Sequence, residues 1–171
     1  MSVTLPNSHE YELEQAIYGI LADINNDVTT SPAISIYTQN RIGAKVSPYI
    51  TISAKTQRQL IQPYSGVYEM EATIEVVMRT FNASLIDEVY QYVVALLYDE
   101  ATTLVQKIQF NSTNLKTYMA RITSQTPSIK TNRGHKQSLV ITAIVTPSAI
   151  GDGLRFLDFS NYLNSQYVAL V

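Results

Sequence analysis

The sequence predicts an α+β domain: a mostly antiparallel sheet with two helices packed on one face. Two stretches carry apolar residues at the three- and four-residue spacing of helices, and the others alternate apolar and polar residues as strands do. The strands are grouped rather than strictly alternating with helices, which favours antiparallel pairing. The expected order is α-β-β-β-α-β-β, followed by a C-terminal extension.

Length and composition indicate one domain with a polar but weakly charged surface. The chain has 171 residues, of which we assign 1–147 to the domain and 148–171 to the extension. Hydrophobic residues make up 46% and charged residues only 15%, below the usual quarter. The 12 Tyr residues fit a contact surface, although drift in composition explains them equally well.

Charge and cysteine content argue against several functions. The net charge is −2 and the Lys and Arg residues are scattered, unlike a sequence-specific nucleic-acid reader. The chain has no Cys, so disulfides, thiolate zinc sites and Cys nucleophiles are excluded. The N-terminus lacks the pattern of a signal peptide, and no apolar stretch approaches the roughly 20 residues that span a bilayer. We expect no membrane partner.

The first half of the chain reads as one helix and three strands. The helix is predicted over residues 8–25, with one apolar stripe at Leu13, Ala16, Ile17, Ile20, Leu21 and Ile24. The strands are predicted over residues 31–40, 48–56 and 67–80, from alternation and β-branched residues.

A second helix is predicted from Ser84 through Leu104. Ser84 and Asp87 form a start resembling a capping box, in which a side-chain oxygen accepts from a free N–H of the first turn. The apolar stripe comprises Ile86, Val89, Tyr90, Val93, Val94, Leu97, Ala101 and Leu104.

Two further strands are predicted, over residues 115–125 and 137–148. The second is apolar on both faces, which indicates a central or interface strand. The loop between them is the most basic segment and contains Gly134, so we expect an exposed hairpin tip over residues 126–136. Its candidate interface residues are Lys130, Arg133, His135 and Lys136.

The C-terminal extension is apolar and aromatic, whereas a free tail is normally polar. It packs either on its own domain or as an arm on a neighbouring subunit or partner. Its candidate interface residues are Phe156, Phe159, Tyr162 and Tyr167.

Glu69, Glu71 and Glu75 share one face of the third predicted strand, because side chains two residues apart point the same way. Grouped carboxylates can perform acid–base chemistry or hold a cation. Such sites usually need further groups such as His, Asn or Asp, and the sequence spacing identifies none. A solvated sheet face is therefore the favoured interpretation. In a ring, the same row would face the lumen and repel passing DNA.

No catalytic, cofactor-binding or metal-binding residues are predicted, and we expect no enzyme. The two histidines, His9 and His135, lie in a helix start and a hairpin tip, so a triad or a two-His metal site is not favoured. The sequence has no GxGxxG, Walker or GxSxG motif.

The order of these elements resembles the tail terminator (tail completion) proteins of the neck region of long-tailed bacteriophages. The matching features are the helix "YELEQAIYGILADI", the Pro-led strands "SPAISIY" and "PYITISA", the long strand "GVYEMEATIEVVMRT", the helix "SLIDEVYQYVVALLYDEAT" and a final two-stranded hairpin. The resemblance covers residues 8–147 and is one of order and pattern.

This resemblance implies a virion structural protein that forms a ring, usually a hexamer. The ring would cap the tail tube, end tube polymerisation and join the tail to head-completion proteins. Implied partners are further copies of the chain, the tail tube protein, a head-completion or neck protein and a sheath protein where the tail is contractile. DNA would pass through the lumen without specific binding. The implied location is the virion tail and neck, after assembly in the host cytoplasm.

Two alternatives to this reading remain. One is another head–tail connector or head-completion protein, which would share the composition. The other, from a different class, is a small ferredoxin-like binding domain or enzyme that uses the glutamate face. A concave pocket with perturbed carboxylates would indicate an enzyme, and a closed ring would indicate a structural protein.

Overall fold

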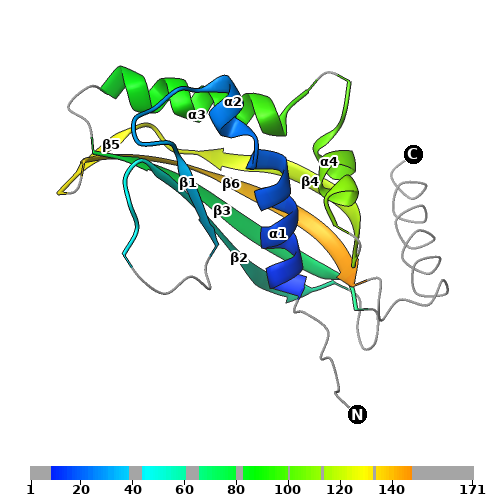
Figure 1. Ribbon diagram of the computed structural model, residues 1–171. Coiled ribbons are helices and arrows are strands. Elements are labelled where there is room, and N and C mark those ends of the chain that lie inside the picture. Colours follow the sequence, from blue (N-terminus) through cyan, green and yellow to red (C-terminus); the bar gives the residue numbers. More distant parts are fainter. Residues whose placement is uncertain are drawn as a thin grey trace, which may run out of the picture.

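The computed structural model describes residues 9–38, 44–60, 66–79, 83–99, 101–112, 114–132 and 134–147. Figure 1 shows two layers, a twisted sheet with helices along one of its faces. The α+β prediction is therefore confirmed, including the mostly antiparallel sheet and the order of its main elements.

The sheet has the strand order β1-β2-β3-β6-β4, and β5 pairs with the start of β6. Among the described strands, only β1 and β2 are parallel neighbours, and the other pairings are antiparallel. The predicted central strand does lie between two neighbours, because β6 pairs with β3 on one side and with β4 on the other. The strands are β1 (Ser35–Thr38), β2 (Tyr49–Gln59), β3 (Tyr68–Met78), β4 (Leu115–Gln125), β5 (Ile129–Thr131) and β6 (Gly134–Pro147).

The helical layer contains α1 (His9–Leu21), α2 (Ile24–Asp27), α3 (Ala83–Leu97) and α4 (Leu104–Phe110). The prediction of one second helix through Leu104 is wrong, because α3 ends at Leu97 and a new helix begins at Leu104. Thr103 causes this restart. Its hydroxyl accepts a hydrogen bond from the Gln106 N–H, and the Gln106 side chain accepts one from the Thr103 N–H, which completes a capping box.

The hydrophobic core lies between the two layers. On β3, Met70, Ala72 and Ile74 are buried and alternate with the glutamates. Leu13 and Ile17 of α1 belong to the same cluster, and both are fully buried. Burial of one such large side chain contributes about 1.5–3 kcal/mol, so this alternation fixes which face of the sheet meets the helices.

Helical side chains also satisfy the backbone at two sheet edges. The pairing of β1 with β2 ends at Ile52, and beyond it the backbone amides of Ala54 and Thr56 donate to carboxylates of α1. On β4, the Gln109 side chain of α4 donates to the Leu115 carbonyl and accepts from the Thr117 N–H. These contacts fix the helices against the sheet and cover backbone groups that another strand could otherwise pair with.

Candidate functional site

The sheet face opposite the helices carries the glutamate row that the sequence analysis singled out. Glu69, Glu71 and Glu75 all lie on it, because their neighbours in β3 point into the core. In Figure 1 the described helices lie on the other side of the sheet. We call this surface the open face and define it by Thr51, Ser53, Lys55, Glu69, Glu71, Thr73, Glu75, Ser138, Val140, Thr142 and Ile144.

Each glutamate of the open face is paired with a cation from a neighbouring strand. The pairs are Arg58–Glu69, Lys55–Glu71 and Lys136–Glu75. Their closest N–O distances are 3.0, 3.6 and 3.0 Å respectively. Arg58 donates from both Nε and Nη2 to one carboxylate oxygen. The row is therefore charge-compensated, and this weakens the expectation that it repels DNA as an uncompensated acidic wall.

Between the ion pairs, the open face is rich in hydroxyl groups. Thr73 of β3 lies opposite Ser53 of β2 and Val140 of β6. The hydroxyls of Thr123 and Thr142 are 3.0 Å apart. A surface of short hydroxyl side chains and mutually neutralised charges can meet another protein without leaving a buried, unpaired charge.

The described basic residues predicted for the hairpin tip over residues 126–136 lie on two different strands. Lys130 lies on the exposed strand β5, as a hairpin-tip residue would. His135 and Lys136 instead belong to β6, and Lys136 is already engaged by Glu75. The prediction of one loop over residues 126–136 is corrected accordingly, because pairing between β5 and β6 continues to Gly134.

Several predicted interface residues cannot be placed. Arg133 lies outside the described residues, as do Phe156, Phe159, Tyr162 and Tyr167. Their assignment to an interface stays a prediction from the sequence.

The two histidines lie at opposite ends of β3. His9 stacks on Tyr68 with ring centroids 4.2 Å apart, and its Nε2 is 2.7 Å from the Thr56 hydroxyl oxygen. Burial lowers the pKa of His9, and this effect outweighs the opposing charge of Glu10. His135 pairs with Met78 at the other end of the strand. The structure does not bring the two imidazoles together.

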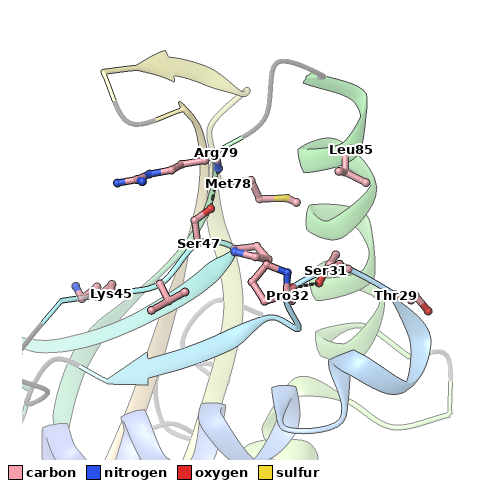
Figure 2. Close-up of a pocket in the computed structure, with 11 residues that line it drawn as sticks. Thr29, Ser31, Pro32, Lys45, Ser47, Met78, Arg79 and Leu85 are labelled. Atoms are coloured by element: carbon pink, nitrogen blue, oxygen red, sulfur yellow. Dashed lines mark hydrogen bonds between the residues drawn. The ribbon is translucent and has the colours of Figure 1, made fainter.

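A pocket of about 560 Å³ lies where β1 and β2 begin and β3 ends. Four separate segments line it, residues 29–32, 45–48, 78–79 and Leu85. Figure 2 shows that Met78 points toward α3, which carries Leu85, whereas Arg79 and Lys45 extend away from α3. Ser47 fixes the end of β3, because its hydroxyl oxygen accepts a hydrogen bond of 2.8 Å from the Arg79 N–H.

Sequence reasoning missed this pocket, because no periodicity relates its four segments. One signal was present. The dipeptides Ser31–Pro32 and Ser47–Pro48 each precede a strand, and since these strands are parallel neighbours, both dipeptides reach the same end of the sheet.

In the described part of the chain, His, Asp and Glu form no group of three that could hold a metal ion. No helix among the described residues is long and apolar enough to cross a membrane. A scan against protein-family models gives no match for this chain, and a search of the curated proteins also gives none.

Proposed function

We propose that this chain is a virion structural protein that forms a ring on the tail tube of a long-tailed bacteriophage. The ring would end tube polymerisation and join the tail to the head-completion proteins of the neck. One observation carries the proposal most directly: among the described residues no helix covers the open face, and every glutamate in its central acidic row is charge-compensated.

A closed ring needs two different contact surfaces on each subunit, because each copy meets one neighbour on each side. The open face offers one. The helical layer offers another, because it exposes large aromatic side chains: Phe110 is 78% exposed and Tyr98 is 60% exposed, with Tyr18 of α1 at 41%. Exposed aromatic residues are typical anchors of protein interfaces.

The remaining parts of the proposal follow from the family that the sequence resembles. The partners would be other copies of the chain, the tail tube protein and a head-completion protein. DNA would pass through the lumen without a sequence-specific contact. The protein would be found in the virion neck, after assembly in the host cytoplasm.

The proposal is tested by adding the purified protein to tail-tube subunits of the same phage while they polymerise. A cap occupies the growing end, so tubes should stop elongating and carry one ring at that end in electron micrographs. Tubes of unchanged length with bare ends would refute the proposed function. A variant lacking residues 150–171 serves as the control, since it is expected not to form rings.

A further inference from the structure

We propose that the pocket between β1, β2, β3 and α3 is the acceptor for the C-terminal extension of a neighbouring subunit. The inserted segment would be Leu157–Asp158–Phe159. An apolar side chain would enter the pocket, and the Asp158 carboxylate would meet Arg79 and Lys45 at its rim. This inference rests on the proposed ring.

The lining of the pocket combines polar and apolar side chains. Its volume lies within the range of about 300–1,000 Å³ typical of ligand pockets. Hydroxyl groups are contributed by Thr29, Thr30, Ser31 and Ser47. The apolar lining comprises Pro32, Val46, Pro48, Met78 and Leu85.

The charge at the rim is positive and uncompensated by the described residues. Arg79 and Lys45 extend to the same side (Figure 2), and no carboxylate is among the described residues that line the pocket. Neither cation forms an ion pair within the described ranges, in contrast to the three cations that pair with the glutamates of the open face. The Lys45 ammonium lies 5.9 Å from the centroid of the Tyr49 ring, which also leaves its charge unneutralised. The rim is therefore suited to a carboxylate.

The extension carries the complementary pattern. It contains two acidic residues, Asp152 and Asp158. Asp152 lies between two glycines, whereas Asp158 lies between Leu157 and Phe159. Only the second places large apolar side chains directly beside a carboxylate, and the pocket is lined by both apolar and cationic side chains that could contact them.

The position of the pocket favours a neighbouring subunit as the donor. β6 begins beside the pocket, since His135 pairs with Met78, and it ends at Pro147 opposite Leu115. Its 14 residues span roughly 45 Å at about 3.3 Å per residue. The extension thus starts at the opposite end of the sheet from the pocket. Donor and acceptor at opposite ends give a head-to-tail contact, which forms a ring when the rotation between successive subunits closes.

The absence of native Cys allows a direct cross-linking test. Two full-length versions with different tags, one Val46→Cys and the other Leu157→Cys, are co-expressed and oxidised. We expect a disulfide-linked dimer carrying both tags. The matched control uses Ile129→Cys in place of Val46→Cys. Val46 and Ile129 are similarly exposed, at 58% and 52%, and Ile129 is not among the described residues that line the pocket. It should give no dimer.

Charge reversal tests the rim contact. Arg79→Glu should abolish the cross-link, and the additional change Asp158→Lys on the arm-bearing version should restore it. Asp152→Asn is the control and should leave the yield unchanged. If the combination of Arg79→Glu and Asp158→Lys restores the cross-link, the loss caused by Arg79→Glu alone cannot be due to misfolding of that variant.

The outcomes separate this inference from the proposed function. If the uncross-linked protein is a ring by native mass but no two-tag dimer forms, the pocket is not the acceptor and the ring proposal stands. A disulfide within one chain of the Val46→Cys/Leu157→Cys double variant would show that the extension folds onto its own pocket, and this would overturn the inference. A monomer by native mass would count against both.

Discussion

The side chain of Glu14 in α1 accepts a hydrogen bond from the backbone N–H of Ala54 in β2, with Oε1 and N 2.9 Å apart. Glu14 is only 2% exposed. One helical turn earlier, Glu10 accepts from the Thr56 N–H at 3.1 Å. Ile52 is the last residue of β2 that pairs with the described part of β1, and beyond it these two carboxylates of α1 supply acceptors to backbone amides of β2.

The first prediction concerns this contact. Glu14→Ala should lower the free energy of unfolding by about 2 kcal/mol, because it leaves the buried Ala54 N–H without its acceptor. Urea denaturation followed by circular dichroism measures the change. Glu88→Ala, at an exposed position of α3, is the matched control and should change stability by no more than about 0.5 kcal/mol. Equal effects of the two substitutions would refute a structural role for Glu14.

The second prediction concerns acid sensitivity. Burial lowers the pKa of His9 below its usual 6.5, so the unfolded chain binds a proton more readily than the folded chain. Stability should therefore fall as the pH drops below about 6.5. His9→Phe keeps a ring that can stack on Tyr68 but cannot be protonated. The melting temperature of this variant should fall less between pH 7 and pH 5 than that of the wild type. Parallel pH profiles for the two proteins would contradict this account.

The third prediction concerns the turn at the start of β6. Gly134 has a φ of 126°, which disfavours other residues, and an added Cβ would collide with the Met78 carbonyl and the Arg79 backbone. Gly134→Ala should lower the free energy of unfolding by roughly 1–3 kcal/mol. Thermal melts provide the measurement. Thr131→Ala, in the same hairpin and exposed, should have a smaller effect. A melting temperature unchanged by Gly134→Ala would show that the hairpin adopts another backbone conformation.

The fourth prediction concerns the glutamates of the open face. Glu75→Gln should cost less than about 1 kcal/mol of stability, because its ion pair with Lys136 is partly exposed. The loss of stability should be smaller in about 1 M salt, where the Debye screening length is roughly 3 Å. Denaturation at low and high salt tests this. A loss of stability of several kcal/mol that does not depend on salt would mean that the glutamates are buried instead of partly exposed to solvent.

The fifth prediction concerns assembly. Deleting residues 150–171 should abolish ring formation and leave a folded domain, because the core described above lies within residues 13–145. Native mass and circular dichroism, measured on the same sample, separate loss of assembly from loss of folding. An intact ring after the deletion would exclude the extension as the connecting arm.

Local patterns were sufficient to predict most of the fold. Strict alternation identified β3 and placed its three glutamates on one face, and the same reasoning gave the bounds of β4 as residues 115–125. The break between α3 and α4 was missed, because apolar residues continue at helical spacing across it. Recognising Thr103 and Gln106 as a capping box would have revealed the second start.

The candidate sites could not be predicted from the sequence, because they depend on contacts between residues far apart along the chain. Pairing of Glu75 with Lys136 follows from the register between β3 and β6, which joins residues far apart in the sequence. The buried role of Glu14 follows from a contact between α1 and β2 that joins residues 40 positions apart in the sequence. The pocket also appears only once the parallel pairing of β1 and β2 is known.

The most direct test of the central claim is the native mass of the purified, full-length protein by light scattering. Six copies of the 19.1 kDa chain would give about 115 kDa, as a closed six-membered ring requires. A single species of 19.1 kDa at every concentration would contradict the proposal that this domain assembles into a ring.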